Sequence, residues 1–236
     1  GDPYAIEPSH TYTGSVGAVY VAQLTVYGAF GWSDTDTYTV QIFSPIQGVM
    51  RDVAIDDGLW YLHKETNRYR SGGLPFADWQ TGGYGVAETA SAIQAFQVQG
   101  HRPGGDPWED PYVEDVQRGW NTLFTHSVVD PMTVQSAGDP DGDGDGVGVG
   151  IYVDYNHSIY EAGLAMMALA STGSPNRVAH TGPPIYVRGQ TYYSITQDMA
   201  DWFAWGQNDS GVARGGWRYQ PNSGESDNSN TQFPVL

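Results

Sequence analysis

The chain has 236 residues and is strongly acidic, with 27 Asp and Glu against 10 Lys and Arg and a net charge of −17. Nucleic acids and anionic lipid surfaces both attract Lys and Arg, so this charge argues against either as a partner. Cysteine is absent, which excludes disulfides, thiolate nucleophiles and Cys-ligated zinc.

Four segments along the chain are rich in small and apolar residues, and the first three end in glycine. The glycines are Gly31, Gly100 and Gly173, spaced 69 and 73 residues apart (100 − 31 and 173 − 100). Glycine just past a helix adopts a positive φ without strain and closes the last turn. We therefore predict inner helices at about residues 15–30, 86–99, 157–172 and 228–236. The first is uncharged but interrupted by glycines, so we expect a buried helix and no membrane span.

A second type of segment alternates with the first. Residues 50–65, 113–127 and 195–205 carry apolar side chains mostly three or four positions apart, with charged residues between them. This spacing is typical of amphipathic helices, whereas a helix that is apolar on every face is buried on every face. The pattern predicts an all-α fold: repeated α-hairpins in two layers, forming a single domain over residues 1–236.

One repeat resembles a known family. Residues 202–217 read WFAWGQNDSGVARGGW, which is similar to the repeat of squalene cyclases and prenyltransferases, where an aromatic outer helix leads through Gln and Gly-x-Trp into an inner helix. Two earlier repeats keep glycines and aromatic residues in a different order. The resemblance implies a partial α/α toroid, which fits the predicted layers.

The catalytic motifs of that family are missing. The acid cluster of squalene cyclases, Asp-x-Asp-Asp, has no counterpart, and the nearest segment holds only Glu225 and Asp227. The zinc site of protein prenyltransferases requires a cysteine. The resemblance therefore implies a fold and argues against the family's best-known reactions.

The most specific local motif is an acidic loop at residues 137–150. It contains DPDGDGDG at residues 139–146, and alternating Asp followed by glycine matches the first half of a calcium loop. Position 12 holds Gly150 or Tyr152 in place of Glu, so a backbone carbonyl, water or a later acid such as Asp154 would complete the site. We predict structural Ca²⁺ there; the alternative is a hydrated, flexible loop. The predicted ligands are Asp139, Asp141, Asp143 and Asp145.

Three carboxylates lie near the starts of predicted inner helices, namely Glu88, Glu161 and Asp227. Such groups complement the helix dipole and cap free N–H groups. Alternatively, they are catalytic candidates on a concave face, where carboxylates beside aromatic rings would suit a glycan. The predicted lining of that cavity is Trp79, Tyr84, Tyr152, His157, Trp217 and Tyr219.

The sequence favours a non-enzymatic binding or self-assembly module, extracellular or on the cell surface. A stack that begins and ends on an inner helix would leave two apolar edges for another copy, or for the remainder of a larger chain. A glycan is a further possible ligand. The alternative function is a glycan-acting hydrolase or lyase, or a terpenoid cyclase-like enzyme, that uses the concave carboxylates.

Overall fold

The computed structural model describes residues 10–235 and shows a mixed α/β protein. Among these residues it contains six α-helices and three two-stranded antiparallel sheets. The chain divides into two compact units, Gly1–Gly58 and Leu59–Leu236. The prediction of an all-α fold is therefore wrong.

The first unit is built around a β-hairpin. Strand β1 (Val19–Tyr27) pairs with β2 (Ser33–Gln41) through a 3₁₀ turn at Ala29–Gly31. The helix predicted at residues 15–30 is absent because Val, Thr and Tyr recur through both segments, and β-branched and aromatic side chains favour strands. No side chain among residues 10–58 is buried. Most apolar side chains of this segment are therefore exposed, but they belong to the strands of a hairpin and not to an inner helix.

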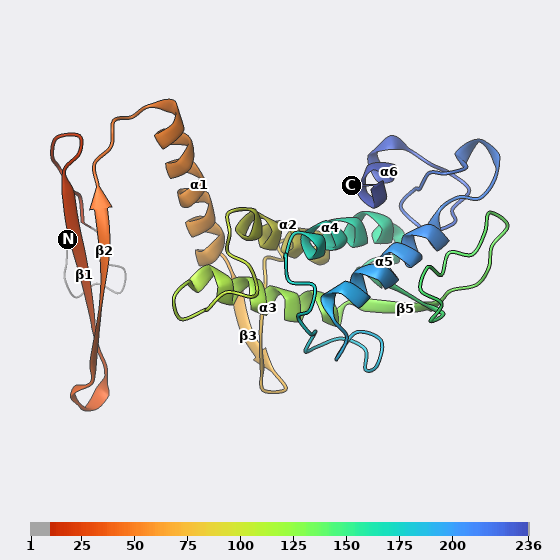
Figure 1. Cartoon of the computed structure of the whole chain (residues 1–236), viewed down its shortest axis with the longest axis horizontal. Coiled ribbons are helices and arrows are strands. Elements are labelled where there is room, and N and C mark those ends of the chain that lie inside the picture. Colours follow the sequence, from red (N-terminus) through yellow and green to blue (C-terminus); the bar gives the residue numbers. More distant parts are fainter. Residues whose placement is uncertain (1–9, 236) are drawn as a thin grey trace. The chain divides into compact units, whose positions relative to one another are not determined.

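The second unit contains the helices predicted from apolar periodicity. Helix α1 (Gln47–Lys64) begins in the first unit and ends in the second. Gly100 and Gly173 follow two of the later helices with φ of 103° and 60°, as expected for residues that close a last helical turn. The remaining helices, seen in Figure 1, are α2 (Gly85–Val98), α3 (Pro111–Thr125), α4 (Ser158–Ala170), α5 (Tyr192–Gly206) and α6 (Asn228–Val235).

Short hairpins interrupt the helices of this unit. Strand β3 (Asn67–Ser71) pairs with β4 (Leu74–Asp78), and β5 (Ser127–Pro131) pairs with β6 (Val147–Ile151). Each strand is only five residues long. The sequence therefore contains no long alternation of apolar and polar residues that would distinguish these strands from helices. The prediction of a two-layer, all-helical toroid is therefore wrong, because short β-hairpins lie between the helices along the chain.

The core of the second unit lies between its helices. Helix α2 packs against α3 and α4, and α4 also packs against α5 and α6. Gly163 on α4 lies directly beside Phe233 on α6, where a Cβ atom would come within 2.4 Å of the Phe233 Cβ. The last predicted inner helix thus covers α4, although its final residue, Leu236, lies outside the described residues. The largest fully buried side chains include Trp120, Trp202, Phe96 and Phe124.

None of the helices within residues 10–235 combines the length and apolar character that a bilayer crossing requires.

Candidate cation site

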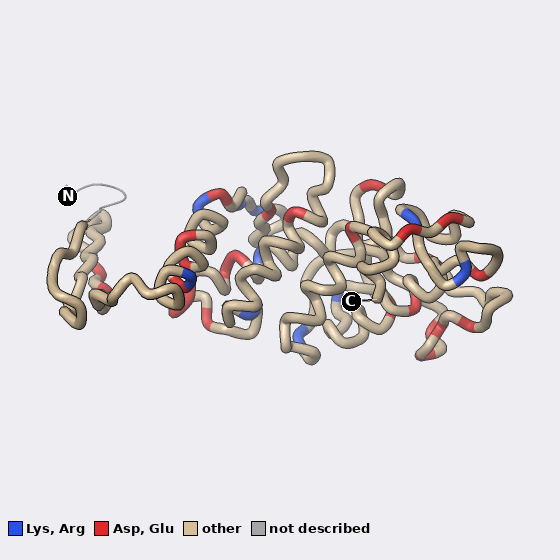
Figure 2. The backbone as a smooth tube through the Cα atoms, turned by 90° about the horizontal axis from the view of Figure 1, so that it is seen from above, with Lys and Arg blue, Asp and Glu red and all other residues tan. Residues whose placement is uncertain are grey.

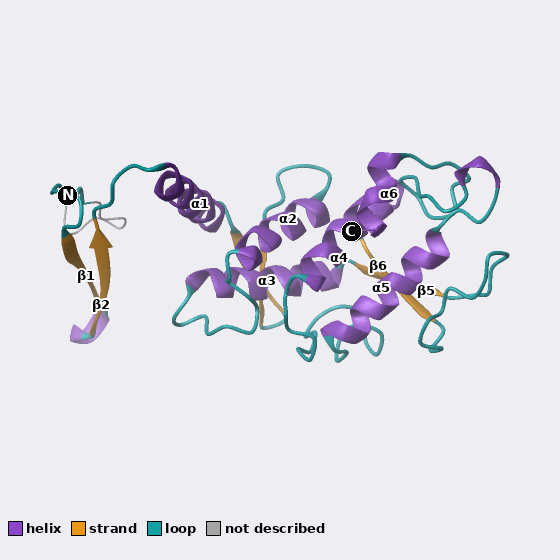
Figure 3. Ribbon diagram, turned by 45° about the horizontal axis from the view of Figure 1, so that its top comes forward, coloured by secondary structure: helices purple, strands orange, loops and turns teal. Residues whose placement is uncertain are grey.

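The acidic loop connects β5 to β6, and β6 packs on helix α5 (Figure 3). Glycine alternates with valine from residue 146 to residue 150, which places Gly148 and Gly150 on the same face of β6. That face lies on Trp202 of α5, and a Cβ atom at Gly150 would stand 2.9 Å from the Trp202 ring. The Trp202 indole also donates a hydrogen bond of 2.8 Å to Asp130 on β5. The repeated glycines therefore let the hairpin lie close against α5.

The loop is folded by its own aspartates. Asp141 accepts hydrogen bonds from the backbone N–H groups of Gly144 (2.8 Å) and Gly146 (2.9 Å). Asp143 and Asp145 each accept one from the residue two positions later. Gly144 and Gly146 have φ of 82° and 80°, which ordinary side chains rarely adopt. The carboxylates are thereby held in a tight turn.

Two further carboxylates reach this loop from α5. Asp198 and Asp201 are only 2% and 4% exposed. Asp201 Oδ1 accepts a hydrogen bond of 3.0 Å from the amide of Gln197 and lies close to Gly142 of the loop. No group in residues 10–235 hydrogen-bonds to Asp198 Oδ1 or to Asp201 Oδ2. Burying an unpaired carboxylate oxygen is costly, so this arrangement calls for a positive partner.

The five carboxylates form two groups that share Asp143. One consists of Asp141, Asp143 and Asp201, and the other of Asp143, Asp145 and Asp198. Within each group the ligand oxygens lie within 4.8 Å of one another. Calcium binds oxygen at about 2.3–2.6 Å, so two ligands of one ion stand at most about 5 Å apart. Each group therefore has dimensions that fit a calcium ion.

The electrostatics of the site also favour a cation. Burial, together with the charges of the neighbouring Asp145 and Asp143, raises the pKa of Asp198 to about 7. Burial likewise raises the pKa of Asp201, although its hydrogen bonds from Gly142 and Gln197 lower it in part. Acidic residues outnumber basic ones along both units (Figure 2). An ion of double positive charge would reverse the repulsion that raises these pKa values.

The predicted metal ligands are only partly assembled. Asp141, Asp143 and Asp145 belong to the two groups, but Asp139 does not, and its carboxylate accepts from the backbone of Asp141. The suggested later acid, Asp154, binds Asn156 and His157 instead. The acids that complete the groups lie on α5. From its sequence this segment was predicted only to be an amphipathic helix with charged residues.

A signal for these two acids is present in the sequence. Asp198 and Asp201 are three positions apart, which puts them on one face of a helix. They lie beside Met199 and Trp202, which are fully buried. An acidic pair within the apolar stripe of a helix is a recognisable sign of a functional or ion-binding position.

The three catalytic candidates are separated in the structure. Glu88 accepts a hydrogen bond of 2.5 Å from the backbone of Thr81, and Asp227 accepts from Asn230 at the start of α6 and pairs with Arg218. Glu161 is fully buried, with one oxygen bound to the Val153 backbone, and burial raises its pKa. Neither of the two cavities described next, nor either carboxylate group of the acidic loop, contains two of the three.

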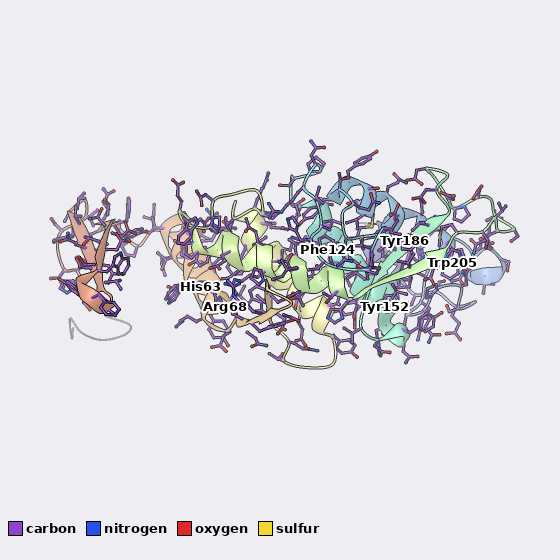
Figure 4. All side chains as sticks on the ribbon, turned by 90° about the horizontal axis from the view of Figure 1, so that it is seen from below. His63, Arg68, Phe124, Tyr152, Tyr186 and Trp205 are labelled. Atoms are coloured by element: carbon purple, nitrogen blue, oxygen red, sulfur yellow. The ribbon has the colours of Figure 1, made fainter. Side chains whose placement is uncertain are left out.

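The six predicted cavity residues divide among three places. Trp79 lines a cavity of about 380 Å³ together with Glu88. Tyr84, His157 and Tyr219 line a second cavity of about 370 Å³. Tyr152 and Trp217 are buried in the core beside Trp202 instead, and Figure 4 labels Tyr152 together with Trp205, which packs against the same cluster.

Comparison of the chain with protein-family models, with curated proteins and with solved structures found no match.

Proposed function

We propose that this protein is a calcium-binding module in which Ca²⁺ joins the acidic loop to helix α5. The observation that carries the proposal is the meeting of three loop carboxylates with two buried carboxylates, each with one oxygen that no residue within 10–235 hydrogen-bonds. Oxygen-only ligands suit calcium better than zinc, which favours nitrogen and sulfur, and magnesium requires near-ideal octahedral geometry.

The ion would have a structural role. The loop forms the β5–β6 connection, and α5 carries Trp202 and Phe203 into the core. An ion bound to both segments would tie the hairpin to the helix and stabilise the folded state by mass action. A binding module fits this geometry better than an enzyme does, because the catalytic candidates stand apart from one another. The self-assembly and the extracellular location expected from the sequence stay predictions.

Isothermal titration of chelator-treated protein with CaCl₂ tests the proposal. We expect saturable binding with two ions per chain, since the two groups share only Asp143. The double variant Asp198→Asn/Asp201→Asn should lose it. Asp56→Asn/Asp57→Asn is the matched control, because it removes the same charge from exposed positions on α1 and should titrate like the wild type.

Two results would overturn the proposal. One is the absence of a binding isotherm at millimolar CaCl₂. The other is unchanged binding in the α5 double variant, which would place any ion elsewhere on this acidic surface.

A further inference from the structure

A second cavity lies apart from the acidic loop, beside the start of α4 and along α6. It has a volume of about 370 Å³, which falls near the lower end of the range of about 300–1,000 Å³ that is typical of small-ligand sites. Its lining combines four aromatic rings and an imidazole with neutral polar side chains: Tyr84, His157, Tyr160, Tyr219, Phe233, Ser229, Asn230 and Gln232.

The aromatic rings hold one another in place. The His157 ring meets Tyr84 edge to face at 4.9 Å between centroids and meets Tyr219 at 5.2 Å. Tyr160 contacts Phe233 edge to face at 5.0 Å. Rings in such contacts offer apolar area with little freedom to lose on binding, so the pocket wall is organised before a ligand arrives.

The polar groups of the pocket are neutral hydrogen-bonding groups. The hydroxyls of Tyr84, Tyr160 and Tyr219 bond to no other residue within 10–235. His157 Nδ1 is held by Asp154 at 2.8 Å, which leaves Nε2 as the ring nitrogen that can face a ligand. Gln232 adds an exposed amide whose nitrogen donates to the Ser229 carbonyl at 3.0 Å, which leaves its oxygen as an acceptor for a ligand.

The charges beside the pocket are paired. Among its lining residues there is no Lys, Arg, Asp or Glu. Asp154 is engaged with His157, and Asp227 forms an ion pair of 2.9 Å with Arg218. A charged ligand would therefore enter without a partner, and a purely apolar ligand would leave the amide oxygen and the tyrosine hydroxyls unpaired.

We infer that this pocket, built from Tyr84, His157, Tyr160, Tyr219, Phe233 and Gln232, binds a neutral saccharide. A sugar ring has C–H faces that pack on aromatic rings and hydroxyls around its edge that pair with amide, phenol and imidazole groups. The inference is independent of the calcium site, because the two sets of residues do not overlap.

Ligand-observed NMR and calorimetry with neutral tetrasaccharides test this inference. The probes are cellotetraose, xylotetraose, mannotetraose, maltotetraose and chitotetraose, with sialyllactose as the charged comparison, all measured in saturating CaCl₂. We expect saturable binding of at least one neutral probe and none of sialyllactose. Tyr84→Ala and Tyr219→Ala should each weaken the binding at least ~10-fold, the equivalent of about 1.4 kcal/mol.

Two further variants make the result specific. Tyr193→Ala is the matched control, because this tyrosine is exposed on α5 and does not line the pocket. Gln232→Leu keeps the side-chain size but removes the amide, and it should also weaken a sugar. A ligand that binds equally well to the Gln232→Leu variant is held by ring stacking alone, which would overturn the saccharide assignment. The absence of binding by every neutral probe, or unchanged binding in both tyrosine variants, would overturn it as well.

Discussion

Two regions of the second unit bury aspartate side chains but handle the charge differently. Asp115 on α3 is fully buried, and its oxygens meet Arg68 Nε at 3.0 Å, Arg68 Nη2 at 2.6 Å and His63 Nδ1 at 2.5 Å. His63 and Arg68 lie side by side in Figure 4. At this site the protein supplies its own cations, and every oxygen of the carboxylate has a partner.

Asp198 and Asp201 on α5 are almost as deeply buried, yet what faces them is a loop of further carboxylates. Arg68 and His63 pair with Asp115, whereas no basic residue within 10–235 forms an ion pair with the two acids of α5. Burial of a carboxylate is tolerated when a cation compensates it. The comparison supports the proposal that the second region takes its compensating cation from solution.

The largest expected effect concerns calcium and stability. At a calcium concentration about 1,000 times the dissociation constant, the wild-type protein should gain about 4 kcal/mol in free energy of unfolding for each bound ion, or about 8 kcal/mol for two. The double variant Asp198→Asn/Asp201→Asn should gain nothing. Urea denaturation with CaCl₂ and with chelator measures both values, and equal gains in the two proteins would break the comparison.

Asp115→Ala should destabilise the protein whether or not calcium is present. Breaking a buried ion pair costs about 3–5 kcal/mol, and the cost should fall to about 2–3 kcal/mol here because Arg68 and His63 partly reach solvent. Urea denaturation measures the loss. A loss that appeared only in chelator would mean that the two regions are coupled and not independent.

Gly150→Ala tests whether the hairpin must lie close against α5. The added methyl group would meet the Trp202 ring and Tyr152, so we expect a loss of about 1–3 kcal/mol and weaker calcium binding. Gly83→Ala is the matched control, because a Cβ atom there meets nothing within 4 Å. Calorimetry and urea denaturation should show an effect for the first variant and almost none for the second.

The smallest effect concerns pH in the absence of calcium. The pKa of Asp198 is raised from 3.8 to about 7, so between these values the folded state holds a proton that the unfolded state has released. The free energy of unfolding should therefore fall as pH rises through this window, by about 1–2 kcal/mol from pH 5 to pH 7.

The variant Asp198→Asn removes this contribution. The lowered pKa of His126, caused mainly by burial, gives a slope of opposite sign, but both proteins share it. The difference between the two proteins therefore isolates Asp198. Parallel pH curves in chelator would contradict the raised pKa.

The sequence by itself determined the local features of this protein. Apolar residues spaced three or four apart predicted α3 and α5, and alternating Asp and Gly indicated residues 139–146 as a candidate calcium loop, since both patterns depend on neighbours within a few residues. The same local reasoning failed at residues 15–30. There, small apolar residues indicated a helix although Val, Thr and Tyr favour strands.

Only the tertiary structure decided what faces the loop. Asp198 follows Asp145 by 53 residues (198 − 145), and no local pattern links them. They meet because Gly148 and Gly150 let β6 lie against Trp202, which brings the acids that precede Trp202 on α5 to the loop. These two carboxylates become buried, at a cost in free energy, only when segments distant in the sequence pack together. The sequence therefore showed which groups could bind a cation, and the packing decided which of them have no other partner.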